Sequence, residues 1–280
     1  MIEIDIRFER PAAALEPMIT SYYFVSVAGP ADASVIDLLH PEWANIRFVS
    51  GPAWQMRSDE GAFVDAPPAA LFGPTSKARM IRGGPGMITG IGLTPPGWRR
   101  LIGTDASQIA NSFIDLARLP ALAALPQAAQ GCATDRDRAD RLDAAILAIA
   151  EPAPAVRTAQ ALAALRDPAI TDVEAFAAAV GLSTRQLERL CRRDFGFTPK
   201  LLLARQRFLR TLGRMRERLD EPWVSLIDSA YVDQSHFNRD FRRFMGLSPS
   251  EYFALPRVML EPAGVARHAR LGAPLQGLHR

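Results

Sequence analysis

Five polar side chains that could contact nucleic acid stand close together near the C-terminal end of the sequence. They are Gln234, His236, Asn238, Arg239 and Arg242. Arginine, glutamine and asparagine form paired hydrogen bonds with base edges, and arginine also neutralises phosphates. Phe237 and Phe241 are interleaved with them one helical turn apart, so they define an apolar face. The spacing predicts a helix that buries one face and presents the other to a DNA groove.

Signals on both sides predict where this helix begins and ends. Asp233 is placed as its N-cap and Gly246 as its stop. A short apolar run at 226–230 precedes it, followed by a turn. Downstream, Ser248–Glu251 has the spacing of a capping box, which starts another helix. Residues 224–253 are therefore predicted to form a helix-turn-helix.

The same pattern occurs fifty residues upstream. Leu187, Arg189, Arg192, Arg193, Gly196 and Pro199 fall on Phe237, Arg239, Arg242, Arg243, Gly246 and Pro249. The upstream copy has its own start signals, with a capping box predicted at Thr171–Glu174, a turn at Gly181 and a cap at Ser183. An internal repeat of this kind predicts two helix-turn-helix units in one chain.

A long helix is predicted between the two units. Thr198 caps it, Pro199 starts it, and its apolar stripe runs from Leu201 to Leu219. About eighteen residues at about 1.5 Å each give about 27 Å. A rigid spacer of that length could hold the two polar faces in neighbouring major grooves, about 34 Å apart. One face of this helix carries Arg207, Arg210, Arg214 and Arg218, which we expect to be solvated, with an interdomain or phosphate contact as the alternative.

The chain resembles the AraC/XylS transcription regulators over about residues 155–255. The resemblance rests on AVGLSTRQLERLCRRDFGFTPKLLLARQR and on DQSHFNRDFRRFMGLSPSEY. The DNA-binding domain of that family is a pair of helix-turn-helix motifs joined by a long helix, so the resemblance implies a sequence-specific DNA-binding transcription regulator. It places Arg185, Glu188 and Arg189 on the first recognition helix, and Gln234, His236, Asn238 and Arg239 on the second, at positions that face bases or nearby backbone. Phosphate contacts are expected from Arg192, Lys200 and Arg242.

The charge of the chain is uneven. The formal total is only +3, yet residues 155–258 hold 17 basic and 12 acidic residues. This excess is the electrostatic footprint of a domain that meets nucleic acid. At 280 residues the chain is long enough for two domains. We expect a β-rich sensory or dimerisation domain with C-terminal helices over 1–150, a double helix-turn-helix domain over 155–258 and a basic tail over 259–280, with Glu151–Pro154 as a short stiff linker.

The N-terminal region alternates apolar and polar residues with a period of two, beginning at Ile2–Phe8. Further β-rich runs occur at 21–27, 35–40, 46–49, 62–65 and 87–93, and helical patterns follow at 95–102 and 135–149. This order is similar to the cupin-like sensory domains of many AraC-type regulators. The expected fold class is α+β, with an N-terminal β-rich cupin-like barrel or sandwich with helices and an all-α C-terminal domain.

The N-terminal region offers little chemistry for catalysis or metal binding. Its one histidine, His40, is too few for a cupin metal site, which needs several converging ligands. We therefore expect no enzyme activity, no metal and no cofactor. A ligand cavity could be lined by Trp43, Phe48, Trp54, Phe63 and Phe72, although aromatic residues at strand spacing are also typical of a core. The ligand-binding residues stay open.

Double-stranded DNA is the expected partner. A small-molecule effector, a second copy of the chain in a homodimer and RNA polymerase are further candidates, and no membrane contact is expected. Cys132 and Cys191 are expected to be reduced thiols in the cytoplasm. Two alternatives remain: a cupin-like enzyme with an appended DNA-binding domain, and an N-terminal protein-interaction module without a small ligand.

Overall fold

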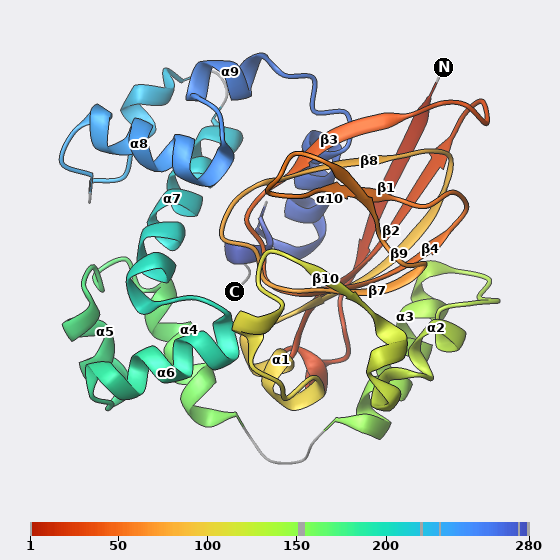
Figure 1. Ribbon diagram of the computed structural model, residues 1–280, viewed down its shortest axis with the longest axis horizontal. Helices are drawn as coiled ribbons and strands as arrows, with labels where there is room; N and C mark the ends of the chain where they lie inside the picture. Colours follow the sequence, from red (N-terminus) through yellow and green to blue (C-terminus); the bar gives the residue numbers. More distant parts are fainter. Residues whose placement is uncertain (1, 151–154, 219–220, 230, 274, 279–280) are drawn as a thin grey trace.

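The computed structural model describes residues 2–150, 155–218, 221–229, 231–273 and 275–278 (Figure 1). Strands dominate the N-terminal region and helices the C-terminal region, which confirms the predicted α+β class. The expected linker Glu151–Pro154 and the end of the apolar stripe at Leu219 lie outside the described residues.

The strands of the described residues form two antiparallel sheets, one of six strands and one of four. The six-stranded sheet has the order β1-β2-β9-β4-β7-β10, and the four-stranded sheet has the order β3-β8-β5-β6. Their bounds are β1 Glu3–Glu9, β2 Ile19–Ala28, β3 Val35–Leu39, β4 Asn45–Ser50, β5 Gln55–Arg57, β6 Phe63–Asp65, β7 Ala69–Phe72, β8 Arg79–Gly83, β9 Gly86–Leu93 and β10 Phe113–Asp115. Every predicted strand is present. The sequence patterns missed β5, β7, β8 and β10, which are short.

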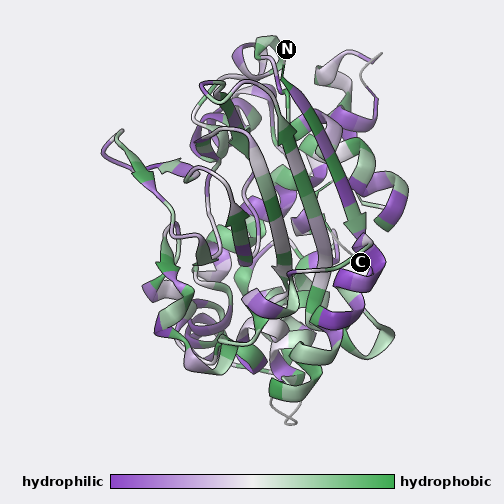
Figure 2. Ribbon diagram, turned by 90° about the vertical axis from the view of Figure 1, so that its right-hand side faces the viewer, coloured by the Kyte–Doolittle hydropathy of each residue, from purple (hydrophilic) through white to green (hydrophobic). Residues whose placement is uncertain are grey.

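Alternate side chains of the six-stranded sheet face two different cores, because successive residues of a strand point to opposite faces. On one face, Tyr22 packs with Trp98 and Leu142 from the covering helices. On the other face, Val25 packs with Ile81 of the four-stranded sheet. Figure 2 shows the corresponding alternation of hydrophobic and hydrophilic segments along the central strands.

Short helices cover the outer face of the six-stranded sheet. They are α1 (Pro95–Leu101), α2 (Leu125–Ala128) and α3 (Asp135–Ile149), with the 3-10 turns η1 (Ala13–Leu15), η2 (Ala106–Gln108), η3 (Leu116–Arg118) and η4 (Pro120–Leu122). Thr94 caps α1, and Thr134 caps α3 in a full capping box. Both predicted helices of this region are therefore present.

The C-terminal helices form two clusters joined by one long helix, α7, at the left of Figure 1. The elements are α4 (Val156–Arg166), α5 (Val173–Val180), α6 (Thr184–Phe195), α7 (Pro199–Glu217), η5 (Trp223–Leu226), α8 (Gln234–Met245), α9 (Pro249–Ala254), α10 (Leu260–Leu271) and η6 (Gln276–Leu278). Phe176, Leu187 and Cys191 lie in the core of the first cluster. Phe208 and Phe237 lie in the core of the second.

The predicted helix boundaries hold at almost every position. Ser183 caps α6 and Ser248 caps α9, each in a capping box, and Thr198 caps α7. The predicted capping box at Thr171–Glu174 is wrong, because Asp172 is the N-cap of α5 and accepts the N–H of Ala175. The second unit also differs from expectation, since its leading segment is the 3-10 turn η5 rather than an α-helix.

The described part of the segment predicted as a basic tail is folded. Beyond α9, residues 260–271 form α10, which packs against β1 and β3 of the N-terminal region. Figure 1 shows the chain crossing from the upper helical cluster back to the sheets. Asp37 of β3 accepts the N–H groups of Met259 and Leu260 at 2.6 and 2.9 Å, so an N-terminal side chain satisfies the first turn of α10.

Candidate nucleic-acid interface and interior cavity

The first recognition helix, α6, has a clear division between its faces. Leu187, Leu190 and Cys191 are buried, and burial raises the pKa of the Cys191 thiol. Arg185 and Arg189 are exposed and make no ion pair among the described residues. The N-cap Ser183 and the left-handed Gly196 fix where the helix begins and ends. The outward arginines are therefore available to a phosphate or a base edge.

The second recognition helix, α8, repeats this division. Phe237 and Phe241 are fully buried, whereas Gln234, Arg239 and Arg242 are exposed. Arg239 has no ion-pair partner in the described part of the chain. Arg189 and Arg239 thus lie at equivalent places on two exposed faces, as the fifty-residue repeat predicts.

The remaining predicted DNA contacts vary in exposure. Lys200 is exposed at the start of α7. Glu188 and Arg192 are exposed and pair with one another at 3.1 Å, with side-chain exposures of 51% and 53%. Asn238 is half-buried, and its Oδ1 has no hydrogen-bond partner among the described residues. These two positions, Glu188 and Asn238, flank the exposed face rather than occupy its centre.

His236, predicted to face DNA, is half-buried and makes a polar contact within the domain. Its Nε2 lies 3.3 Å from a guanidinium nitrogen of Arg207, and its ring meets Tyr231 edge-on. Arg207 also donates to Asp240 at 2.9 Å, and the Tyr231 hydroxyl donates to the same carboxylate at 3.2 Å. Burial, followed by the charge of Asp240, raises the pKa of Tyr231. His236 therefore belongs to a polar cluster that joins α8 to α7.

The arginine row on α7 was predicted to be solvated, and for three of its members this is wrong. Arg207 pairs with Asp240, while Arg214 and Arg210 lie 2.5 and 3.6 Å from Asp228. Arg218 alone is mostly exposed and pairs with Glu221. None of the four makes an ion pair with residues 2–150 among the described residues, and a phosphate contact stays a prediction. These arginines attach the second helix-turn-helix unit to the long helix.

A different set of contacts holds the first unit. Asp194 of α6 is 1% exposed and accepts the hydroxyl of Thr158 at 2.6 Å and Arg193 at 2.6 Å. Phe195 packs edge-on against Trp43 of the N-terminal region, with ring centroids 5.7 Å apart. The first unit therefore combines a buried carboxylate, held by Thr158 and Arg193, with aromatic packing against the N-terminal region.

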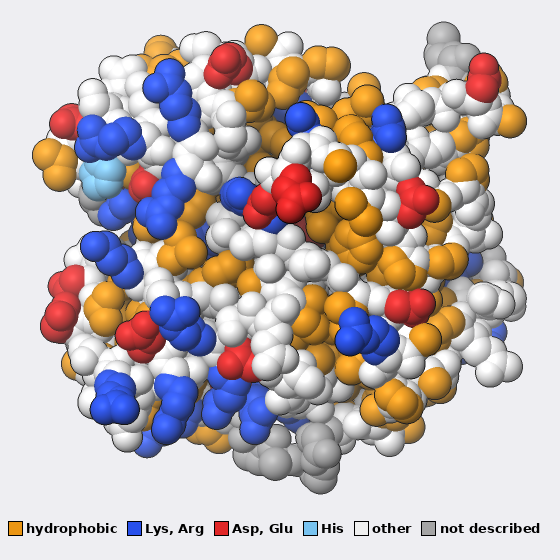
Figure 3. Space-filling view, in the orientation of Figure 1, with side chains coloured by type: hydrophobic (Ala, Val, Ile, Leu, Met, Phe, Trp, Pro, Cys, Tyr) orange, Lys and Arg blue, Asp and Glu red, His pale blue; other side chains and the backbone are white. Residues whose placement is uncertain are grey.

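The surface of the two units carries a concentration of basic side chains. Figure 3 shows Lys and Arg side chains gathered at the left of the molecule, over the helical clusters, while the right-hand side carries fewer. The uneven charge of the sequence is thus displayed on the surface that holds α6 and α8. Such a field attracts a phosphate backbone over a distance of about 10 Å at ordinary salt.

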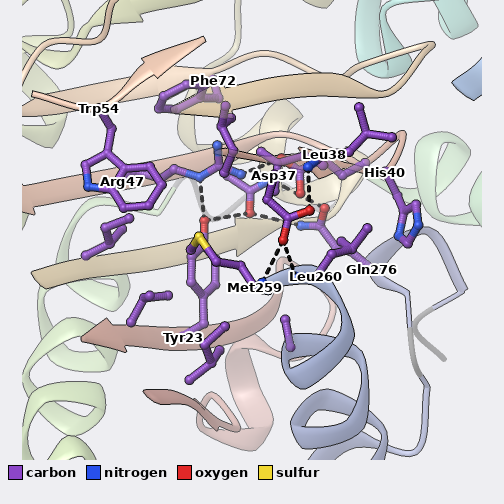
Figure 4. A pocket seen from close by; sticks show the side chains of 18 of the residues that line it. Tyr23, Asp37, Leu38, His40, Arg47, Trp54, Phe72, Met259, Leu260 and Gln276 are labelled. Carbon is purple, nitrogen blue, oxygen red and sulfur yellow. Dashed lines mark hydrogen bonds and ion pairs between the residues drawn. The ribbon is translucent and has the colours of Figure 1, made fainter. Parts of the chain in front are cut away.

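A cavity of about 170 Å³ lies in the interior of the N-terminal region, between the two sheets and α10 (Figure 4). Its walls are mostly apolar and include Trp54, Phe72 and Met259. At its polar side, Arg47 donates to the Tyr23 hydroxyl at 2.7 Å and pairs with Glu42. The cavity joins strands of the N-terminal region to the segment that follows the second helix-turn-helix unit.

The five aromatic residues considered for a pocket divide between several places. Trp54 and Phe72 line the cavity. Trp43 packs at the junction with α6, and Phe48 packs against the core beneath the helices. Phe63 lies on the four-stranded sheet, under the guanidinium of Arg82. Sequence spacing could not distinguish these places, because each depends on which sheet or helix covers the strand.

His40 lies at the junction between the regions. Its Nε2 is 2.8 Å from the Tyr252 hydroxyl, and its Nδ1 is 3.4 Å from Arg216. An arginine can only donate, so Nδ1 accepts and the imidazole is neutral. Burial, followed by the charges of Arg216 and Arg257, lowers the pKa of His40 well below its ordinary value. Among the residues that the structure describes, no cluster of three or more His, Cys, Asp or Glu side chains could hold a metal ion.

Residues 176–254 match the family described as a helix-turn-helix domain. These residues are an AraC-type helix-turn-helix domain. The match runs from within α5 to the end of α9, so this domain holds both recognition helices, and it confirms the predicted resemblance. No curated protein sequence matches the chain. None of the helices in the described ranges is both long and apolar enough to cross a membrane.

Solved structures of ToxT from Vibrio cholerae are similar to this chain over most of its length. One has a TM-score of 0.45 at 10% identity and covers 90% of this chain and 97% of its own. Another, bound to (E)-4-(8-methylnaphthalen-1-yl)but-3-enoic acid, has a TM-score of 0.45 at 9% identity, with coverage of 90% and 97%. The AraC-like transcriptional activator CuxR has a TM-score of 0.25 at 14% identity and covers 74% of this chain and 85% of its own.

Proposed function

We propose that this protein is a sequence-specific DNA-binding transcription regulator that places α6 and α8 in neighbouring major grooves. The observation that carries the proposal is the equivalence of Arg189 and Arg239. Both stand at the centre of an exposed face, and neither has an ion-pair partner in the described part of the chain. An arginine in that position can form two hydrogen bonds with guanine O6 and N7.

Other arginines of the domain differ from Arg189 and Arg239 in having carboxylate partners. Arg207, Arg210 and Arg214 have carboxylate partners within the domain, so their charge is already matched. Arg185, Arg189 and Arg239 have none among the described residues, and they point outward. Unmatched, outward arginines on two recognition helices support direct contact with DNA. Arg192, Arg242 and Lys200 flank them and suit phosphate contacts, which position the protein without specifying sequence.

The length of α7 supports a two-groove arrangement. Its 19 residues, at about 1.5 Å each, span about 28 Å. The centres of successive major grooves on one side of a duplex lie about 34 Å apart. Because α6 directly precedes α7, and α8 packs on α7 at Arg207 and Phe208, one chain would contact two base clusters about 10 base pairs apart.

The interior cavity supports an effector-binding role for the N-terminal region. It is mostly apolar, and it is lined by both the sheets and the C-terminal segment. In this proposal the protein binds DNA and an effector and catalyses no reaction. Its location is the cytoplasm, where it reaches the DNA. A second copy of the chain and RNA polymerase belong to the same proposal as partners on the DNA.

The test uses the full-length chain and measures binding to a labelled duplex by fluorescence anisotropy across a salt series. The logarithm of the affinity should fall with the logarithm of the salt concentration, with a slope of about −0.9 for each phosphate neutralised. Replacing Arg192 or Lys200 with Ala should weaken all sequences alike and reduce the slope by about 1. Arg118→Ala removes an exposed arginine of the N-terminal region and is the matched control, which should leave binding unchanged. A folded wild-type chain that does not bind any duplex at low salt would refute the proposal.

A further inference from the structure

The second recognition helix is preceded by a strongly exposed valine. Val232 is 89% exposed, more than any other large hydrophobic side chain among the described residues. It directly precedes Asp233, the N-cap of α8. Single exposed apolar residues are common on protein surfaces, so exposure alone carries no conclusion. The position of this valine in the repeat is what distinguishes it.

The first unit uses the equivalent residue differently. Fifty residues upstream, Leu182 stands before the N-cap Ser183 and is half-buried against the apolar core that includes Leu187. A hydrophobic residue before the N-cap commonly packs toward the fourth residue of the helix, which in α6 is Leu187. The apolar residue of the first unit therefore stabilises the fold.

In the second unit the neighbouring residue does this packing. Tyr231 stands where the first unit has Gly181, and it is 7% exposed. Its ring lies edge-on to Phe237, the fourth residue of α8, with ring centroids 5.3 Å apart. Glycine has no side chain to pack, whereas the tyrosine ring already covers Phe237. Val232 is therefore not needed by the core and is left at the outer start of α8.

The start of α8 is where a recognition helix contacts base edges in the major groove. Asp233, Gln234 and Ser235 follow Val232 and are exposed as it is. The Asp233 carboxylate caps the helix by accepting the N–H of His236 at 2.6 Å. A valine has no group that binds a phosphate or a polar base edge. The apolar group that the major groove displays is the C5-methyl of thymine, and apolar side chains contact it.

We propose that Val232 contacts the C5-methyl group of a thymine in the base cluster read by α8, and so sets a preference for an A·T pair there. This rests on the proposed function, because it adds a specificity-determining residue to the second recognition helix. Removing one methyl group from an apolar contact corresponds to about a fourfold loss of affinity.

The test removes only that methyl group. The full-length wild type first selects its duplex from a random pool, and each thymine of the selected motif is then replaced singly by deoxyuridine. Deoxyuridine keeps the pairing with adenine and the O4 acceptor but has no C5-methyl. Fluorescence anisotropy should show about a fourfold loss of affinity at one thymine, which lies in the cluster that Arg239→Ala no longer prefers.

Variants at position 232 assign this loss to one side chain. In Val232→Ser the same replacement should weaken binding by about 1.5-fold or less, because both valine methyl groups are gone. Val232→Ile keeps an apolar side chain and should keep the discrimination. Val265→Ser is the matched control, since Val265 is 68% exposed on α10, and it should show the wild-type loss. Any effect of deoxyuridine on the duplex itself is common to all variants and cancels.

Three results would overturn the inference. The second base cluster could contain no preferred A·T pair, no single replacement could weaken the wild type, or the loss could be as large for Val232→Ser as for the wild type. In each case intact binding to the selected duplex keeps the proposed function and removes this contact alone. A folded wild type that binds no duplex at low salt would remove both.

Discussion

The two helix-turn-helix units present nearly the same outward face but bury different residues at equivalent positions. In the first unit, position 190 is a buried leucine in an apolar core. In the second unit, the equivalent position is Asp240, which is 7% exposed and bound to Arg207 and Tyr231. The first unit opens with the eight-residue helix α5, whereas the second opens with the 3-10 turn η5.

The two units also dock differently on the N-terminal region. The first unit meets it through the rings of Phe195 and Trp43, with the Arg205 guanidinium stacked 3.8 Å from the centre of the Trp43 ring. The second unit meets it through the hydrogen bond between Tyr252 and neutral His40, through the Ala78 N–H, which donates to the Phe244 carbonyl at 2.6 Å, and through apolar packing of Leu38. The repeat therefore preserves the exposed face of each recognition helix, while the side that packs against the rest of the molecule differs between the units.

The largest effect should come from truncating the equivalent buried positions. Leu190→Ala should lower the free energy of unfolding by about 2–5 kcal/mol, because it leaves a cavity. Asp240→Ala should cost about 3 kcal/mol, because it leaves Arg207 partly buried without its carboxylate. Denaturant unfolding of the full-length chain measures both.

A double substitution distinguishes the loss of an ion pair at position 240 from the cavity left at position 190. The double variant Asp240→Leu with Arg207→Met makes the second unit resemble the first. Its free energy of unfolding should lie within about 1 kcal/mol of that of the wild type. Arg207→Met should not rescue Leu190→Ala. If the Asp240→Leu and Arg207→Met pair is as unstable as Asp240→Ala, the ionic account of the second unit is wrong.

An effect of intermediate size should come from pH, because the contact at His40 contains a titratable group and the contact at Trp43 does not. The folded-state pKa of His40 is lowered well below the ordinary value of 6.5. As the pH falls, His40 is therefore protonated in the unfolded state before it is protonated in the folded state. Stability contributed by neutral His40 is therefore complete above about pH 6.5 and is lost as the pH falls below it, by up to about 1.4 kcal/mol for each pH unit. Arg216, Arg257 and Tyr252 are the titratable groups that face it.

The comparison of His40→Gln with wild type tests this. The variant should be less dependent on pH between about 6.5 and 4.5 in urea unfolding, by the amount that His40 contributes. Trp43→Phe, at the other docking contact, should keep the pH dependence of the wild type because it changes no titratable group. Parallel pH profiles for wild type and His40→Gln would contradict the account.

The smallest effect should come from the exposed pair on the first recognition helix. Glu188→Ala removes the partner of Arg192, yet both side chains are about half exposed. Such pairs contribute about 0.3–0.5 kcal/mol. Thermal unfolding should therefore show almost no change in the free energy of unfolding. A decrease in the free energy of unfolding of more than about 1 kcal/mol would contradict this prediction, because it would mean that the exposed pair stabilises the fold.

The sequence alone predicted the parts of the molecule that depend on local signals. Caps at Ser183, Asp233 and Ser248 and the left-handed glycines act within a few residues, so both recognition helices were placed correctly. The short strands β5 and β8 were missed because they are defined by their partners across the sheet. The arginines of α7 were misassigned because their carboxylate partners lie on other elements.

The interior cavity shows where local patterns stop being informative. Trp54 and Phe72 were among five aromatic candidates, but nothing local separated them from the other three. Arg267 lies 246 residues from Ser21, to which it donates, so only the fold brings α10 to the cavity. A basic residue near the end of a chain is typical of a solvated tail, whereas Arg267 is 6% exposed and packs against the sheets.

The most direct test of the two-groove account is selection of binding sites from a random DNA pool by the full-length wild type, Arg189→Ala and Arg239→Ala. The wild type should select two base clusters about 10 base pairs apart. Each variant should lose preference in one cluster only, and the two variants should lose different clusters, because the arginines stand on separate recognition helices. Loss of preference at the same bases in both variants, or no change in the selected motif in either, would contradict the account.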